Sequence, residues 1–249
     1  MTKPSENTRV VATIHTPLSD NWEKDKKNIK KEAEKPTLAI NYYNHAHLIQ
    51  TLFNIRTYDT PAQPNHPQRK GLLRDVHDEL FPIAHFANQY FTSPENVVIQ
   101  WVDGNQQHDA TVKYIEQGSN DSDIHYLEVT TLQGKEDADE LKELSEGPIS
   151  MIVNRASIEN KHNRKITQLV EVLKKKAVIN YPDQTALLIY TDEDRIKNFH
   201  FGPPIPEINK KEDYKKVLQK FKPLIKNFSH IFIYSKNEIY CTYKKNEED

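Results

Sequence analysis

Two stretches of the chain carry apolar residues at helical spacing. In LLRDVHDELFPIAHFANQYF (72–91), the apolar stripe consists of Leu72, Val76, Leu80, Ile83 and Phe86. In KITQLVEVLKKKAVINY (165–181), it consists of Ile166, Leu169, Val170, Leu173 and Ala177. Positions three and four residues apart share one side of a helix, so both stretches are predicted to be amphipathic helices. Pro82 is expected to kink the first one, because proline cannot donate the helical hydrogen bond.

Other stretches follow the pattern of strands. NVVIQWV (96–102) is a short apolar run, and DATVKYI (109–115) and IHYLEVTTL (124–132) alternate between apolar and polar residues. Separated by turn residues, these three predict a meander of antiparallel strands. TALLIYTD (185–192) is an unbroken apolar run, typical of a strand buried on both faces. HIFIYSKNEIYCTY (230–243) predicts a hairpin that turns at Lys236 and Asn237.

The order of these elements predicts one α/β domain over residues 71–249, with a mixed sheet and flanking helices. DYKKVLQKFKPLIKNF (213–228) supplies a further helix between the central strand and the hairpin. Residues 1–70 are predicted to be a polar N-terminal extension, partly disordered and partly helical, because they begin with alternating charges and end in a proline-rich segment. Within it, TLAINYYNHAHLIQTLFNI (37–55) has helical spacing.

Composition narrows the class of protein. Of 249 residues, 36% are hydrophobic and 28% are charged, and the formal net charge is −2. The chain is not basic overall, so any binding of nucleic acid has to rest on local patches. One cysteine excludes a disulfide framework and a four-cysteine zinc site. No apolar run approaches the roughly 20 residues that span a bilayer, which predicts a soluble, cytoplasmic protein without a membrane segment.

Two acids lie in the strands of the predicted meander. Successive side chains of a strand point to opposite faces, so Asp109 shares a face with Lys113, and Glu128 shares one with Thr130. If the two strands are hairpin neighbours, Asp109 and Glu128 meet on one face. Ionised carboxylates held close together repel each other unless a cation lies between them. Mg²⁺ suits such a pair, because it takes a few carboxylate oxygens and keeps waters for substrate phosphates.

The order of helix, β-meander, helix and central strand, with Asp109 on the second strand and Glu128 on the third, resembles the restriction endonuclease-like fold of the PD-(D/E)xK nucleases. The resemblance covers residues 72–192. It implies hydrolysis of DNA phosphodiesters that depends on Mg²⁺ or Mn²⁺. By this resemblance Asp109 and Glu128 are catalytic metal ligands. Glu79 corresponds to the acid that many members bring from the first helix, with Asp78 as its competitor.

The chain departs from that motif at the lysine. The family reads Glu-x-Lys, and this chain reads Glu128-Val129-Thr130. The lysine orients the attacking water and offsets negative charge, which a threonine hydroxyl cannot do. Lys113 is the first candidate for a displaced lysine and Lys165 the second. If neither reaches the metal, the alternative is a non-catalytic module for binding nucleic acid or for protein assembly.

The basic cluster KHNRK (161–165) supplies the expected contacts with the DNA backbone, through Lys161 and Arg164. Many members of the superfamily act as dimers, so the resemblance allows a homodimer, although no residue pattern marks an interface. Other classes of enzyme find no support: HExxH, G-x-S-x-G, P-loop and Rossmann motifs are absent from the sequence.

Overall fold

The computed structural model describes residues 19, 21–58, 71–104, 106–115, 123–134, 137, 155–193 and 208–245. Within these residues, seven strands form one mixed sheet in the order in which they occur along the chain. The strands are β1 (Thr37–Leu38), β2 (Val97–Trp101), β3 (Ala110–Tyr114), β4 (Tyr126–Thr131), β5 (Thr185–Tyr190), β6 (His230–Tyr234) and β7 (Ile239–Lys244). Strands β4, β5 and β6 are parallel, and all other neighbours are antiparallel. The predicted meander of β2, β3 and β4 and the hairpin of β6 and β7 are therefore confirmed.

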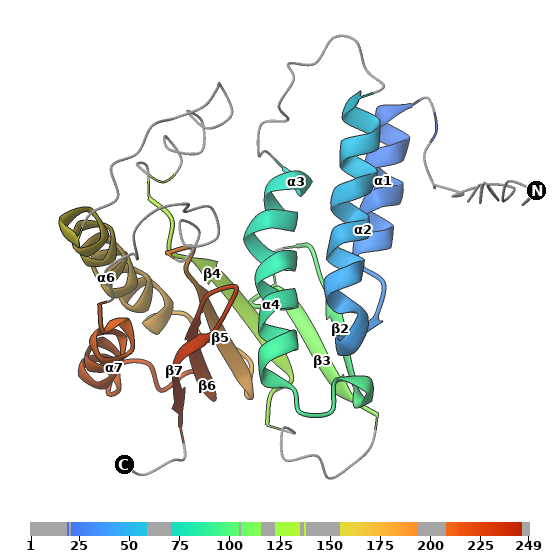
Figure 1. Cartoon of the computed structure of the whole chain (residues 1–249). Coiled ribbons are helices and arrows are strands. Elements are labelled where there is room, and N and C mark those ends of the chain that lie inside the picture. The colour runs from blue at the N-terminus through green and yellow to red at the C-terminus, as the bar shows by residue number, and fades with distance from the viewer. Residues whose placement is uncertain are drawn as a thin grey trace, which may run out of the picture.

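Helices cover both faces of the sheet (Figure 1). One layer consists of α1 (Trp22–Ala33), α2 (Ala39–Tyr58), the short α3 (Leu72–Asp75) and α4 (Phe81–Tyr90). The other layer consists of α6 (Arg155–Ala177) and α7 (Lys210–Phe221). A single turn of 3-10 helix, η2 (Pro94–Asn96), leads into β2. The prediction of an α/β fold with a mixed sheet between helices is confirmed.

The central strand β5 contributes to two separate cores. Its residues Ala186 and Leu188 pack with α1, α2 and α4, and Leu187 and Ile189 pack with α6 and α7. All four side chains are completely buried. Because successive residues of a strand face opposite ways, an unbroken apolar run was needed here, as the sequence predicted.

The kink expected at Pro82 takes the form of a π-helical turn, η1 (Val76–Leu80), inserted between α3 and α4. The amide of Phe81 donates to the carbonyl of Val76, five residues back. Proline clashes with the carbonyl four residues before it, and widening the preceding turn relieves that clash. The wider turn carries Glu79, one of the predicted site residues.

The region predicted to be an N-terminal extension is part of the main core where the structure describes it. On α2, Tyr42, Ala46 and Ile49 are completely buried, and β1 pairs with β2 at the edge of the sheet. Packing therefore does not separate residues 21–58 from the rest of the protein at residue 70. The helical part of that prediction corresponds to α1 and α2, and the proline-rich segment at 60–70 lies outside the described residues.

Candidate functional site

Asp109 and Glu128 come from neighbouring antiparallel strands. In the register of β3 and β4, Ala110 lies opposite Leu127 and Thr111 lies opposite Tyr126. Asp109 directly precedes β3, and its amide donates to the carbonyl of Leu127, the residue that pairs with Ala110. The regular register therefore ends before Asp109. The charge of Glu128 acts on Asp109, so the two acids are neighbours at this end of the strand pair.

The carboxylate of Asp109 is held in place by the backbone of β4. Its Oδ2 accepts a hydrogen bond from the amide of Val129 at 2.6 Å, and its own amide donates to the carbonyl of Leu127 at 2.8 Å. Burial, together with the negative charge of Glu128, raises the pKa of Asp109 to about 7. An acid with so high a pKa lies where a cation would favour its ionised form.

Glu79 lies close enough to Asp109 for the two charges to interact. Its Oε2 accepts a hydrogen bond from the indole Nε1 of Trp101 at 2.7 Å. Burial raises the pKa of Glu79 to about 8, and the charge of Asp109 adds to the increase. Asp78, the alternative for this role, instead has its carboxylate 3.8 Å from the guanidinium of Arg74. The hydroxyl of Tyr42 is buried without a hydrogen-bond partner among the described residues, and burial and the charge of Glu79 raise its pKa.

Glu128 has a positively charged partner that the sequence analysis missed. Its Oε1 accepts a hydrogen bond from the ammonium of Lys176, at the end of α6, and another from the hydroxyl of Tyr181 at 3.3 Å. Lys176 also acts on Asp109, since its charge opposes the increase in the pKa of that acid. A signal was available: Lys176 follows Leu169 and Leu173 at the spacing of the buried stripe of the helix.

The two lysines predicted to assist the water lie elsewhere. Lys113 is exposed on β3, four residues along the strand from Asp109, which corresponds to about 13 Å of extended chain. Lys165 is completely buried near the middle of α6. It precedes Lys176 by eleven residues, or about 16 Å along the helix axis. Lys165 therefore belongs to a different group of residues from Lys176.

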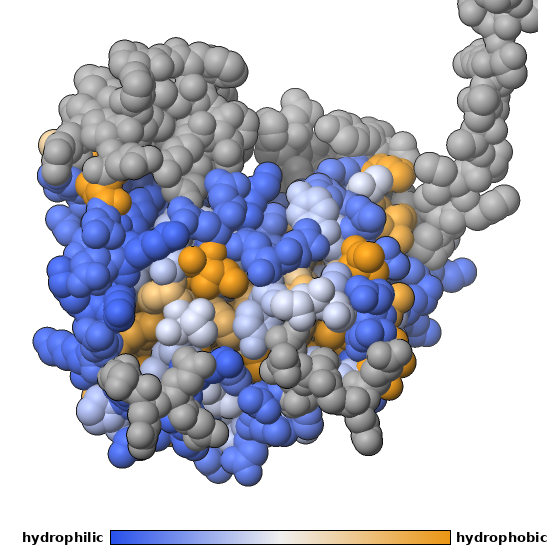
Figure 2. Space-filling view, turned by 60° about the horizontal axis from the view of Figure 1, so that its bottom comes forward, coloured by the Kyte–Doolittle hydropathy of each residue, from blue (hydrophilic) through white to orange (hydrophobic). Residues whose placement is uncertain are grey.

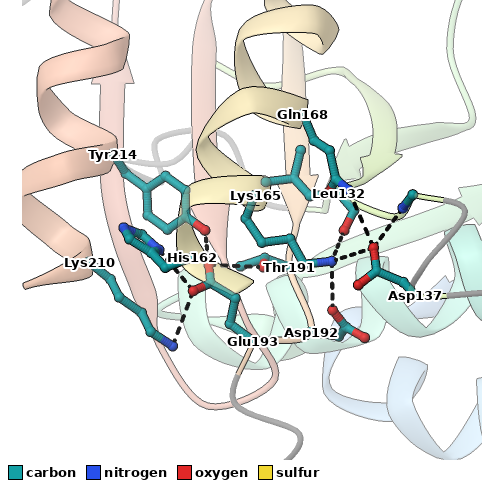
Figure 3. A network of polar contacts seen from close by, with 11 residues as sticks. Leu132, Asp137, His162, Lys165, Gln168, Thr191, Asp192, Glu193, Lys210 and Tyr214 are labelled. Atoms are coloured by element: carbon teal, nitrogen blue, oxygen red, sulfur yellow. Dashed lines mark hydrogen bonds and ion pairs between the residues drawn. The ribbon is translucent and has the colours of Figure 1, made fainter. Parts of the chain in front are cut away.

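That second group is a network of buried polar side chains where β4 and β5 end (Figure 3). The ammonium of Lys165 lies 3.0 Å from Asp137 and 3.1 Å from Asp192, and it also donates to the carbonyl of Leu132. The backbone amide of Gly134 donates to Asp137 at 2.6 Å, and this bond together with Lys165 lowers the pKa of Asp137 against the effect of burial.

The network continues from Lys165 toward α7. The carboxylate of Glu193 accepts from the hydroxyl of Tyr214 and lies 2.9 Å from Nδ1 of His162 and 3.4 Å from the ammonium of Lys210. These contacts join α6 and α7 to the segment that follows β5. Lys165 is buried because it is part of this network, where it connects α6 to the residues that follow β4 and β5.

Lys161 and Arg164, the predicted contacts with DNA, lie on α6 beside this network and are half-buried. They lie in the N-terminal half of the helix, 15 and 12 residues before Lys176. The structure does not bring them to the acids.

Two carboxylates and an ammonium side by side can bind a divalent cation and a phosphate group. Among the described residues, no three His, Cys, Asp or Glu side chains are arranged to hold a metal ion together. Mg²⁺ does not require three, because it is commonly bound through one or two carboxylates, with waters and substrate phosphates completing its shell. Asp109 and Glu128 fit that requirement, and the raised pKa of Asp109 is what a desolvated ligand without its cation would have.

None of the helices in the described part of the chain combines the length and the apolar composition that crossing a membrane requires. Comparison of the chain with models of protein families, with curated proteins and with solved structures gives no match.

Proposed function

We propose that this protein is a metal-dependent nuclease that hydrolyses DNA phosphodiesters with a diverged restriction endonuclease-like core. The observation that carries the proposal is the charge interaction between Asp109 and Glu128, with the ammonium of Lys176 bonded to Glu128. The meander, the following helix α6 and the parallel strand β5 support it, because they correspond to the element order of that fold.

Asp109 and Glu128 are the residues that would hold Mg²⁺ or Mn²⁺. When bound, the metal would polarise the phosphodiester and favour the formation of hydroxide from water. Glu79 would adjust the charge of the site, because it accepts a hydrogen bond from Trp101 and its charge interacts with that of Asp109. Because the pKa of Asp109 is near 7, the site would gain its second negative charge only around neutral pH in the absence of metal.

Lys176 takes the role that Thr130 cannot fill. Its ammonium carries the charge that the Glu-x-Lys lysine supplies in the family, and it reaches Glu128 from a helix instead of from the same strand. There it would orient the attacking water and offset the negative charge that develops on the phosphate. Tyr181, which donates a hydrogen bond to the same carboxylate, would fix the rotamer of Glu128.

A cleavage assay tests the proposal. Purified protein is incubated with plasmid and with labelled oligonucleotides of DNA and of RNA, in Mg²⁺, in Mn²⁺ and in EDTA. We expect metal-dependent cleavage of DNA by the unchanged protein and at least about 100-fold slower cleavage by Asp109→Asn and by Glu128→Gln. Titration of Mn²⁺, followed by its electron paramagnetic resonance signal, should show weaker binding by both variants. No cleavage in any metal, together with equal Mn²⁺ binding by all three proteins, would contradict the proposal.

A second candidate function is a non-catalytic module that binds nucleic acid or assembles with another protein. The observation that favours it is the close pairing of Lys176 with Glu128, which leaves that carboxylate partly neutralised already. This candidate predicts DNA binding that is unchanged by EDTA and by Asp109→Asn, with no cleavage in any metal.

A further inference from the structure

Exposed lysine and aliphatic side chains gather where α6 ends. The side-chain amide of Asn227 donates to the carbonyls of Lys176 at 3.0 Å and of Ile179 at 2.7 Å. These bonds hold the segment that follows α7 against the end of α6. Lys226 and Leu224 lie in that segment, and Lys174 and Lys175 lie in the last turn of α6, against which it is held. We call Lys174, Lys175, Val178, Leu224 and Lys226 the lysine surface.

The side chains of the lysine surface are open to solvent. Lys174, Lys175 and Lys226 are exposed, and none of them forms an ion pair with an acid in the described ranges of the chain. Val178 is 85% exposed and Leu224 is 59% exposed. Figure 2 turns the lower end of Figure 1 toward the viewer, and hydrophobic side chains gather near the centre of that otherwise hydrophilic face.

The stability of α6 does not account for this whole surface. Lysines near the C-terminus of a helix interact favourably with its dipole, which gives Lys174 and Lys175 a local role. Lys226 belongs to a different segment, however, and the exposure of Val178 and Leu224 has no such local benefit. A surface that combines these features suits an anionic partner with some apolar area.

The lysine surface adjoins the acid pair. Lys176 directly follows Lys174 and Lys175 on α6, but its side chain turns inward to Glu128. A polyanion held on the exposed lysines would therefore lie at the turn of α6 from which Lys176 reaches Glu128, on the outer side of the helix. Since the net charge of the chain is −2, attraction of a polyanion has to come from a local group of this kind.

We infer that the lysine surface binds the phosphate backbone of the DNA duplex that the acid pair is proposed to cleave. This inference rests on the proposed function and gives the acid pair its substrate track. It assigns backbone contact to the C-terminal end of α6, in place of Lys161 and Arg164 in its N-terminal half. The aliphatic side chains would contact the sugars between phosphates.

The test measures DNA binding separately from cleavage. Anisotropy of a short labelled duplex is followed in EDTA, over a series of salt concentrations, with the full chain and with Lys174→Glu, Lys175→Glu and Lys226→Glu combined. The control combines Lys24→Glu, Lys26→Glu and Lys27→Glu, three exposed lysines on α1 in the opposite helix layer. Circular dichroism and thermal unfolding verify that both variants fold.

We expect the triple change on the lysine surface to weaken binding by about 10-fold or more and to reduce the salt slope by about 2 to 3, since each phosphate contact contributes about 0.9. The control should bind like the unchanged protein. Equal binding by all three proteins would overturn the inference, even if the unchanged protein cleaves DNA. It would also be overturned if the triple change abolished binding to vesicles rich in phosphatidylserine but not to DNA. Loss of DNA binding in the triple variant, from a protein that never cleaves, would support the lysine surface and contradict only the nuclease proposal.

Discussion

At the scale of single residues, Asp109 and Glu79 are acids in surroundings that favour the protonated form. Their pKa values are raised to about 7 and about 8, first by burial and then by a neighbouring acid. Within the described residues neither acid forms an ion pair with a lysine, and the ammonium of Lys176, whose charge acts on Asp109, is bonded to Glu128. Such an arrangement costs stability when the acids ionise, which is typical of sites built for binding or catalysis.

This cost predicts a pH dependence of stability. The unfolded pKa values are near 3.8 and 4.5, so between those values and about 7 to 8 the folded state binds more protons than the unfolded state. The free energy of unfolding, measured by urea denaturation without divalent metal, should therefore fall as pH rises from about 4 to 8. The slope is at most about 1.4 kcal/mol per pH unit for each group.

Asp109→Asn and Glu79→Gln should each make that decline shallower, and Mg²⁺ should restore stability most at the high end of the range. Asp78→Asn is the matched control, since Asp78 lies on the same π-turn but near Arg74. A decline that is equally steep in all three variants would show that neither acid titrates as described.

Lys176 provides a second prediction at this scale. Lys176→Met should reduce metal-dependent cleavage by about 100-fold or more, because a positive charge beside the reacting phosphate is lost. Mn²⁺ binding should persist, since Glu128 loses a competing cation. Lys24→Met, an exposed lysine of α1 outside both the acid site and the lysine surface, should cleave at the unchanged rate. If both variants cleave equally well, Lys176 has no part in the reaction.

At the scale of elements, α6 carries two lysines that turn toward the sheet with different roles. Lys176 reaches the acid pair, and Lys165 lies between Asp137 and Asp192 where β4 and β5 end. The helix is thus joined to the sheet by polar contacts near its middle and at its C-terminal end, with Leu169 and Leu173 packed between them. The apolar stripe fixes the rotation of the helix, and that rotation places both lysines.

Lys165 should therefore matter for stability. Lys165→Met would leave the carboxylates of Asp137 and Asp192 buried without their cation, so we expect a loss of about 3 to 5 kcal/mol in the free energy of unfolding. Lys174→Met, on the exposed side of the same helix, should change it by less than about 0.5 kcal/mol. Urea denaturation measures both. A small effect of Lys165→Met would mean that the network does not hold α6 in place.

At the scale of the whole molecule, the core that packs under the acid site is built partly from the first 58 residues. The buried face of α2 packs on β2 and α4. The charge of Glu79 acts on the hydroxyl of Tyr42, which belongs to that helix. The site therefore depends on a part of the chain that its polar composition made look separable.

A fragment of residues 71–249, the domain that the sequence predicts, should not fold stably. Removing α1, β1 and α2 would expose the apolar faces of α4 and β2 and uncover the edge of the sheet. We expect a fragment with a broad thermal transition that binds hydrophobic dyes and aggregates, measured against the full chain. A fragment that unfolds cooperatively at the same temperature as the full chain would contradict this.

The sequence by itself determined the strands of the sheet, the two-sided burial of β5 and the placement of Asp109 and Glu128 at neighbouring strands. These features follow from the two-residue period of a strand, which is local and can be read along the chain. The apolar residues Leu127 and Val129 face one core of the protein. Glu128, which lies between them, therefore points to the other side of the sheet. The sequence predicted a kink at Pro82 but not the π-turn, because both relieve the clash between the proline ring and the carbonyl four residues before it.

Only the tertiary structure decided which lysine meets the acids and whether the N-terminal helices belong to the core. Lys176 and Glu128 are separated by 48 positions in sequence, and no local period relates a helix to a strand so far away. Their contact depends on how α6 packs across β4 and β5. In the same way, charged residues dominate the composition of α1, whereas its membership of the fold rests on a few inward side chains, such as Ile29 and Ala33, whose partners come from elsewhere in the chain.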